Sequence, residues 1–265
     1  MDILHEIAQK TSERIEAQKQ VLSLESLAEI AQRRPSTEDF PFEKALRQDD
    51  VAFICEIKKA SPSKGIIAPD FPYGEIAKDY SDAGAAAISV LTEPFYFKGS
   101  NQYLCEIADA VDTPLLRKDF TVDSYMIYEA KILGASAVLL ICSLLDEKTL
   151  ARYLEIAHKL GLSALVETHN EDEVKMALGA GARVVGVNNR NLKTFEVDIT
   201  LSERLRKLVP SEVIFVSESG ISSPEDISIL RKIGADAVLI GESIMKSADK
   251  KAEINRLRGT GHGKD

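Results

Sequence analysis

The sequence predicts an α/β protein, a (β/α)8 TIM barrel with an N-terminal helical extension. After residue 50, short apolar runs alternate with stretches of helical periodicity. Four of these runs follow a Gly-Ala pair, at Gly84, Gly134, Gly181 and Gly234. The interval of roughly 50 residues suits two strand–helix units per repeat, so we expect eight strands. A segment of about 50 residues precedes the first run, which is far longer than a connection needs.

Eight runs have the length and the Val, Ile and Leu content of strands that are covered on both faces. They are residues 51–57, 85–91, 113–120, 136–142, 163–169, 183–189, 212–219 and 236–243. Helix signals lie between them: Asn170 followed by Glu173 is typical of a capping box, and Ser223-Pro224 of an N-cap and first helical residue. A doubly wound open sheet is the structural alternative, but no GxGxxG follows the first run to favour it.

The N-terminal segment 3–34 carries apolar residues at helical spacing and is predicted to be helical. One interpretation is a cap that shields one end of the barrel. The alternative is that the segment also covers the mouth where chemistry occurs. We expect one domain over residues 1–265, with 1–50 as the helical extension and 51–248 as the barrel.

Composition limits the classes of function. The chain has 265 residues, of which 45% are hydrophobic and 28% charged, and a net charge of -9, which argues against nucleic-acid binding in general. No run approaches the roughly 18 apolar residues of a membrane span, and the N-terminus is unlike a signal peptide, so we expect a cytoplasmic protein without membrane contact. Three scattered cysteines do not suggest a disulfide framework. The oligomeric state stays open, a monomer included.

Charged and amide side chains gather at the ends of five predicted strands. Residues two apart in a strand share a face, and active sites of such barrels form at the carboxyl ends of the strands. Side chains that share a face with preceding apolar residues are Glu56, Lys58, Lys118, Glu167, Asn188, Arg190 and Glu218. If these faces point inward, the side chains meet at one mouth. The alternative is that each lies where a strand emerges into solvent. Lys59 and Arg117 have the opposite parity and are assigned to solvent or salt bridges.

The loops after the last two predicted strands suggest what is bound. Gly220 ends the segment SESG, and Gly241 stands just before a helical start. Small residues let backbone N–H groups approach an oxyanion, and a phosphate site after strands 7 and 8 recurs in these barrels. With Ser61 nearby in a closed barrel, a phosphorylated small molecule is the expected ligand.

Six segments, in order along the chain, resemble the indole-3-glycerol-phosphate synthase family: EIKKASPSKG, LLRKDF, LVETHN, VNNRNL, SESGI and IGESIM. The resemblance covers nearly the whole chain. It implies a cofactor-free carbon–carbon lyase of tryptophan biosynthesis, a decarboxylase that converts 1-(2-carboxyphenylamino)-1-deoxyribulose 5-phosphate into indole-3-glycerol phosphate, carbon dioxide and water. It also implies that the N-terminal extension helps to cover the substrate.

The resemblance implies roles for individual residues. Lys118 corresponds to the general acid that protonates the carbonyl oxygen, and Glu167 to the general base of dehydration, with Lys58 and Glu56 beside the reacting centre. The residues expected to orient the anthranilate and hydroxyl groups are Asn188, Arg190, Glu218 and Ser219. Those expected to bind phosphate are Ser61, Gly220, Gly241 and Glu242, with Glu242 acting through its backbone N–H.

Three other functions remain as alternatives. In a class I aldolase-type barrel, Lys118 or Lys58 would form a Schiff base, which borohydride would trap. A non-catalytic phosphosugar-binding barrel would bind substrate without turnover. Metal-dependent hydrolysis is the third, but the four histidines show no HxH or HExxH spacing, so we expect no metal site and place them on the surface or in loops.

Overall fold

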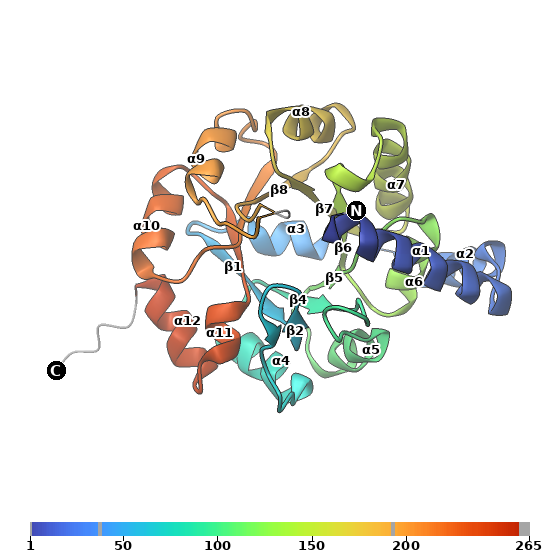
Figure 1. The fold of residues 1–265 in the computed structure, drawn as a ribbon, viewed down its shortest axis with the longest axis horizontal. Helices are drawn as coiled ribbons and strands as arrows, with labels where there is room; N and C mark the ends of the chain where they lie inside the picture. Colours follow the sequence, from blue (N-terminus) through green and yellow to red (C-terminus); the bar gives the residue numbers. More distant parts are fainter. Residues whose placement is uncertain (1, 37–38, 192–193, 260–265) are drawn as a thin grey trace.

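The predicted runs form a closed barrel in the computed structural model, which describes residues 2–36, 39–191 and 194–259. Eight parallel strands of the described chain follow the order β1-β10-β9-β8-β7-β6-β5-β4, so the ring closes between β4 and β1 (Figure 1). Their bounds are β1 (Ala52–Ile57), β4 (Ala87–Leu91), β5 (Leu115–Lys118), β6 (Ala137–Ile141), β7 (Ser163–Thr168), β8 (Val184–Asn188), β9 (Ile214–Glu218) and β10 (Ala237–Ile240). The barrel prediction is confirmed, and the open sheet is wrong.

Helices surround this barrel (Figure 1). They are α4 (Tyr73–Asp82), α5 (Asn101–Ala110), α6 (Ser124–Ile132), α7 (Glu147–Lys159), α8 (Glu171–Gly179), α9 (Thr200–Arg206), α10 (Pro224–Lys232), α11 (Glu242–Lys246) and α12 (Lys250–Arg258), with a 3-10 turn η1 at Cys142–Leu144. Because α12 buries Ile254 and Leu257 against the body, the packed structure continues past residue 248. No helix in the described ranges is both long and apolar enough to cross a membrane.

Local signals for helix ends are present where the sequence places them. Asn170 Oδ1 accepts a hydrogen bond from Glu173 N at 2.9 Å and so caps α8, but Glu173 Oε2 accepts from the backbone N–H of His169, so this cap differs from the predicted capping box. Ser223 forms a capping box with Asp226. The four glycines of the Gly-Ala repeat all have positive φ, between 73° and 88°. This left-handed conformation ends each preceding helix and turns the chain into the next strand, and it favours glycine because a Cβ would crowd the backbone there.

The strand parity inferred from the sequence is also confirmed. Apolar side chains of the inward faces form one buried cluster inside the barrel, which includes Ala52, Ile54, Leu116, Leu165, Val184, Val216 and Leu239. The outward faces pack against the surrounding helices in a second, larger cluster. Side chains nearer the carboxyl end of each inward face therefore project into the mouth.

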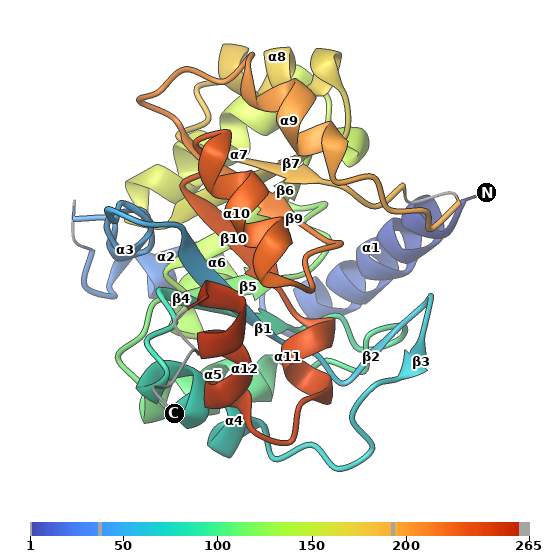
Figure 2. The same ribbon diagram turned by 90° about the vertical axis from the view of Figure 1, so that its left-hand side faces the viewer.

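The N-terminal extension consists of three helices, α1 (Ile3–Val21), α2 (Leu24–Gln32) and α3 (Pro41–Leu46). Ser23 breaks the long helical pattern, because its side chain caps α2. Helix α3 closes the amino-terminal end of the barrel, where Phe42 and Leu46 are fully buried among the interior side chains. Helix α1 lies at the other end (Figure 2). Both interpretations of the extension hold, since α3 closes the amino-terminal end of the barrel and α1 lies across the opposite end.

Polar contacts hold α1 in place over the loop that follows β5. Arg14 Nη2 donates to both carboxylate oxygens of Asp119, at 3.1 and 2.9 Å. Lys19 Nζ lies 2.7 Å from Asp123 Oδ2. Asp119 directly follows Lys118, so α1 is anchored next to a predicted site residue.

Arg117 is more deeply embedded than the sequence suggested. The assignment to salt bridges is right, but the alternative of a solvent position is wrong, because only 1% of its surface is exposed. Its guanidinium donates to Glu129 Oε2 at 2.5 Å, Asn101 Oδ1 at 3.0 Å and Met126 O at 2.8 Å. These bonds satisfy the buried charge and fasten β5 to the helices on either side of it.

We expect Arg117→Met to lower the free energy of unfolding by about 3–5 kcal/mol, because it leaves the Glu129 carboxylate without its buried partner. Chemical denaturation would measure the loss. Arg204→Met is the matched control: Arg204 is exposed and lies 3.9 Å from Asp198, so the change should cost less than about 1 kcal/mol. Equal effects for the two variants would contradict the structural role of Arg117.

The loop after β1 contains an element that the sequence analysis missed. Residues Ala60–Ser61 (β2) and Gly65–Ile66 (β3) pair as a short antiparallel hairpin. The hairpin carries the Ser-Pro-Ser segment and Lys64 at its turn. It stands at the rim of the barrel mouth, on the same side as α1 (Figure 2).

Candidate active site

A pocket of about 450 Å³ opens at the carboxyl ends of the strands. All the predicted site residues line it: Glu56, Lys58, Ser61, Lys118, Glu167, Asn188, Arg190, Glu218, Ser219, Gly220, Gly241 and Glu242. Ile3, Leu4 and Ile7 of α1 contribute to the same lining. The convergence that strand parity suggested is therefore present, and the extension forms part of the wall.

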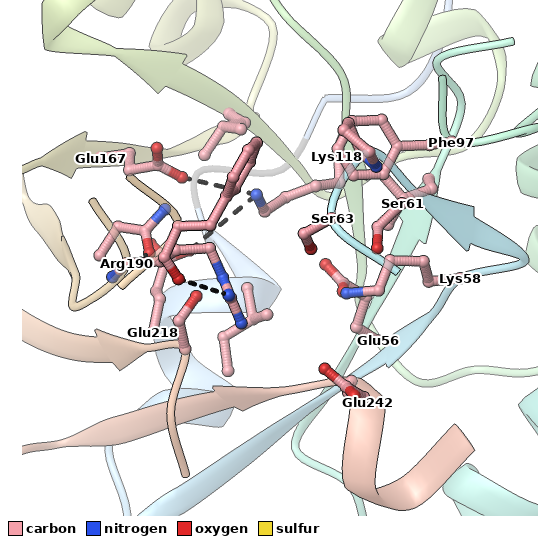
Figure 3. Close-up of a pocket in the computed structure, with 18 of the residues that line it drawn as sticks. Glu56, Lys58, Ser61, Ser63, Phe97, Lys118, Glu167, Arg190, Glu218 and Glu242 are labelled. Carbon is pink, nitrogen blue, oxygen red and sulfur yellow. Dashed lines mark hydrogen bonds and ion pairs between the residues drawn. The ribbon is translucent and has the colours of Figure 1, made fainter. Parts of the chain in front are cut away.

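Lys118 is shared by two buried carboxyl groups. Its Nζ lies 3.5 Å from Glu167 Oε2 and 4.0 Å from Glu218 Oε2. Figure 3 shows the ammonium group reaching from β5 across the pocket toward these two side chains, which come from β7 and β9. The ends of β5, β7 and β9 thus build one charged cluster, because alternate strands of such a barrel contribute inward side chains to the same layer.

Electrostatics set the protonation states of this cluster. Burial would lower the pKa of Lys118, but the neighbouring carboxylates of Glu167, Glu218 and Glu56 outweigh it and hold that pKa above its ordinary value. Burial raises the pKa of Glu218, and repulsion from Glu167 raises it further. For Glu167, burial is outweighed by Lys118 and His169, which lower its pKa. The two carboxyl groups are therefore held in different states, one ionised and one inclined to keep its proton.

A second ion pair lies across the pocket, at the carboxyl end of β1. Lys58 Nζ contacts Glu56 Oε1, and both side chains are largely buried (Figure 3). Gly241 stands directly against the pair, since a Cβ there would lie 2.6 Å from Glu56 Oε1 and 3.2 Å from Lys58 Nζ. The absence of a side chain at position 241 is what lets the loop after β10 approach the strand end of β1.

The loops after β8 and β9 are braced by a buried polar network. Asn189 Nδ2 donates to Ser217 Oγ at 3.0 Å and to Ser219 O at 3.1 Å. Ser219 has φ 67° and Gly220 has φ 80°, so the chain makes two consecutive left-handed residues at the pocket rim. A positive φ is unusual for a serine, and the hydrogen bond from Asn189 Nδ2 to the Ser219 carbonyl helps to stabilise this backbone conformation. Sequence reasoning missed Asn189 because it has the outward parity.

The proposed phosphate end of the pocket is rich in hydroxyl groups and lysines. Glu242 lies 2.6 Å from Lys246 Nζ and 3.8 Å from Lys64 Nζ. The hydrogen bond from Lys246 lowers the pKa of Glu242, and Lys64 adds to that effect. Both lysines thus have the Glu242 carboxylate as counter-ion. The other hydroxyl groups of the lining belong to Ser61, Ser63, Ser219, Ser222 and Ser243.

The remaining wall is apolar and suits a flat ring. Phe97 and Phe120 pack with their ring centroids 5.9 Å apart at the pocket edge. Leu139, Ile141 and Leu239 line the wall from the barrel strands. Sequence reasoning missed Phe97, which lies in a loop where strand parity has no meaning; the aromatic segment PFYF at 94–97 is the signal that could have drawn attention to it.

His169 differs from expectation in its surroundings. It lies in the loop after β7, as predicted, but its side chain is only 15% exposed. Nε2 lies 3.3 Å from Glu167 Oε1 and Nδ1 lies 3.1 Å from Glu173 Oε2. Burial lowers the pKa of His169, but its close contacts with these two carboxylates outweigh burial and raise that pKa to about 10. His262 lies outside the described residues.

Metal ligation finds no support in the geometry. In the described ranges, no three His, Cys, Asp or Glu side chains are grouped so that they could hold a metal ion. The carboxylates of the pocket are instead interleaved with lysines, which act as their counter-ions.

Comparison with known proteins decides the family. The model of the family described as indole-3-glycerol phosphate synthase matches residues 4–257. The chain belongs to the indole-3-glycerol phosphate synthase family. It is 59% identical to the indole-3-glycerol phosphate synthase of Ruminiclostridium cellulolyticum over 258 residues, which cover 97% of this chain and 99% of the relative. The corresponding protein of Lachnoclostridium phytofermentans is 51% identical over 267 residues, covering 97% and 98% of the two chains.

More distant solved structures share the barrel of this indole-3-glycerol phosphate synthase family member. The crystal structure of a 3-hexulose-6-phosphate synthase has a TM-score of 0.62 at 19% identity and covers 79% of this chain and 99% of its own. The mutant tryptophan synthase alpha-subunit from Pyrococcus furiosus has a TM-score of 0.61 at 18% identity, with 79% and 98% covered. At this level of identity the likeness shows the fold alone.

Proposed function

We propose that this member of the indole-3-glycerol phosphate synthase family converts 1-(2-carboxyphenylamino)-1-deoxyribulose 5-phosphate into indole-3-glycerol phosphate, carbon dioxide and water. It acts as a carbon–carbon lyase without a cofactor. The observation that carries the proposal is the Lys118 ammonium group, 3.5 Å from Glu167 and 4.0 Å from Glu218 in a pocket at the barrel mouth. Family membership over nearly the whole chain supports the same reaction.

Ring closure is the step assigned to Lys118. The aromatic carbon that bears the carboxylate attacks the ketone carbon, and negative charge develops on the ketone oxygen. Lys118 Nζ donates a proton to that oxygen. Because the carboxylates around Lys118 hold its pKa above the ordinary value, the amine stays protonated at neutral pH. A protonated amine suits a proton donor and disfavours a Schiff-base nucleophile, which must be neutral to attack.

Decarboxylation and dehydration follow. The bond to the carboxylate carbon breaks, carbon dioxide leaves, and the electron pair restores the aromatic ring. The hydroxyl group formed in ring closure then leaves as water, which requires one proton donor and one base. Glu167, whose pKa is lowered by Lys118 and His169, is ionised and serves as the base. The Glu56–Lys58 pair stands on the opposite wall and supplies the second proton (Figure 3).

Substrate contacts divide the pocket into two ends. The aromatic ring and the hydroxyl groups lie against the residues Asn188, Arg190, Glu218 and Ser219, beside the apolar wall. The phosphate lies at Ser61 and at the backbone N–H groups of Gly220, Gly241 and Glu242. The Glu242 carboxylate is held by Lys246, which supports a phosphate contact through its backbone rather than its side chain.

The direct test is incubation of the purified protein with 1-(2-carboxyphenylamino)-1-deoxyribulose 5-phosphate, followed by indole fluorescence and by release of carbon dioxide. The proposal expects both products in equal amounts. A covalent lysine adduct after borohydride treatment would instead favour the aldolase-type reaction. Binding of the substrate without fluorescent product would favour a non-catalytic barrel.

Gly220→Ala should raise KM by about tenfold or more with a smaller change in kcat, because the phosphate contact is made in ground state and transition state alike. The new Cβ would overlap with Val197 Cγ1, a steric clash that forces the rim to shift, and φ is +80° at this position. Gly234→Ala is the matched control, with φ +75° and no atom within 4 Å of the added Cβ. Steady-state kinetics should show a changed KM only for Gly220→Ala, and inorganic phosphate should compete with substrate. An unchanged KM would place the phosphate elsewhere.

Activity should survive exhaustive dialysis against EDTA, because lysines rather than metal ions balance the carboxylates of the pocket. Turnover before and after dialysis, at equal protein concentration, is the measurement. Loss of activity that Mg²⁺, Mn²⁺ or Zn²⁺ restores would show that a metal takes part in the reaction.

A further inference from the structure

Helix α8 holds the His169 ring on the side that points away from the pocket. Its Nδ1 lies 3.1 Å from Glu173 Oε2 and 3.3 Å from Ser143 Oγ. Its own backbone N–H donates to the same Glu173 oxygen at 2.8 Å. One carboxylate thus binds both the main chain and the ring of His169, and this leaves the imidazole little freedom to turn.

Glu173 is itself held rigidly. Its other oxygen, Oε1, accepts from Asn170 Nδ2 at 2.9 Å and from Ser143 Oγ at 3.0 Å. It stands in the first turn of α8, next to Val174, which is fully buried. A carboxylate with both oxygens bonded and its backbone in a packed helix is a firm anchor.

Nε2, the other ring nitrogen of His169, faces the carboxylate of Glu167. Nε2 lies 3.3 Å from Glu167 Oε1, while Glu167 Oε2 lies 3.5 Å from Lys118 Nζ. The two oxygens of one carboxylate therefore have different partners, one on the outer side and one on the pocket side. Four groups alternate in charge from the pocket outward, in the order Lys118, Glu167, His169 and Glu173.

We propose that His169 is a positioning residue for Glu167: anchored by Glu173, its imidazolium holds Glu167 Oε1, so that Oε2 alone faces Lys118 and the substrate. This inference rests on the role of Glu167 in the proposed function. A carboxylate that can rotate about its last bond presents either oxygen in many directions. A fixed one presents a single oxygen to the proton that it must accept.

The charged groups around the His169 ring favour its protonated form, the imidazolium. Glu167 of β7 and Glu173 of α8 carry the negative charges, while Lys118 of β5 lies beyond Glu167. Glu218 of β9 also faces this cluster. Cys142, whose Sγ lies 3.7 Å from Glu173 O, is a thiol whose pKa burial raises to about 12. Two adjacent carboxylates outweigh one cation at greater distance, which matches the raised pKa of His169.

The test combines titration of the free protein with kinetics. Labelling with 13C at the glutamate carboxyl carbons, with Glu167→Gln to assign the signal, gives the pKa of Glu167 by NMR. In His169→Asn this pKa should move upward by about one unit or more, because a positive neighbour is lost. The kcat should fall by about tenfold to a hundredfold with KM changed less than about threefold, and the acidic limb of kcat should move to higher pH.

Two further variants make the result interpretable. Glu173→Gln keeps the imidazole and weakens its anchor, so it should shift the pKa of Glu167 and lower kcat in the same direction by a smaller amount. It also decides the matter if His169→Asn does not fold. His158→Asn is the matched control. That half-buried histidine packs edge-on against Phe40 with centroids 5.9 Å apart and should leave both readouts unchanged.

The outcomes separate this inference from the proposed function. A wild-type protein without turnover would overturn the proposed function, whereas the titration would still report on the contact between His169 and Glu167. An unchanged pKa of Glu167 in His169→Asn would overturn the positioning role, even if kcat fell. A shifted pKa with normal kcat would overturn it as well, because the contact would then have no part in turnover.

Discussion

Replacement of Lys118 by alanine should lower kcat by about two to four orders of magnitude, with a smaller change in KM. The variant loses the proton donor for the ketone oxygen, a contact that matters most in the transition state. The phosphate and aromatic contacts are made by other side chains and should persist. Rapid-quench analysis would show unreacted substrate bound to the enzyme.

Lys118→Ala should also change the pH dependence of the residual activity. Without the ammonium group, Glu167 and Glu218 lose the cation that lies 3.5 and 4.0 Å from them, and the pKa of each should rise. Residual activity should therefore decline at a higher pH than in the wild type as the solution is acidified. Lys207→Ala, an exposed lysine beside α9, should be near normal in both respects. Near-normal turnover by Lys118→Ala would refute its role as the acid.

Glu167→Gln should stop the reaction at a later step than Lys118→Ala does, namely at dehydration. The amide keeps the shape of the side chain but cannot accept a proton at neutral pH, so dehydration should slow by roughly two orders of magnitude or more. Lys118 keeps Glu218 as a partner at 4.0 Å, and ring closure should continue. A ring-closed, decarboxylated intermediate is then expected to accumulate on the enzyme.

Carbon dioxide and indole fluorescence distinguish this outcome. In Glu167→Gln, a burst of carbon dioxide should precede slow formation of the fluorescent product, whereas the wild type should release both together. Mass spectrometry of the quenched mixture would identify the intermediate as product plus one water. A variant that stalls with neither carbon dioxide nor product would place Glu167 in ring closure and contradict the assignment.

Much of the barrel could be predicted because its signals are local. Each strand is a short apolar run, and each glycine of the Gly-Ala repeat adopts the positive φ that ends a helix. Strand parity needs only alternation, so Glu167 could be placed on the inward face with Leu165 without any knowledge of the neighbours. A barrel brings all such faces to one mouth, which is why residues from five strands proved to line one pocket.

The residues that were missed or only partly placed depend on contacts that strand parity does not describe. Arg117 has the outward parity, which the sequence alone cannot distinguish from a solvent position, but α5 and α6 cover it and supply its partners. His169 follows the last residue of β7, and its contacts with Glu167 and with Glu173 on the next helix are visible only in the structure. Phe97 lies in a loop, where neither periodicity nor parity applies.

By itself, the sequence determined the strands, their inward faces, the helix ends and the set of side chains at the mouth, because these follow from residues close together along the chain. Only the tertiary structure decided that α1 lies across the mouth, with Arg14 bonded to Asp119. It also decided which carboxylate is ionised. Protonation depends on burial and on charges brought within a few ångströms by strands far apart in sequence, and Lys118 and Glu167, 49 residues apart, acquire their chemistry only when the barrel closes.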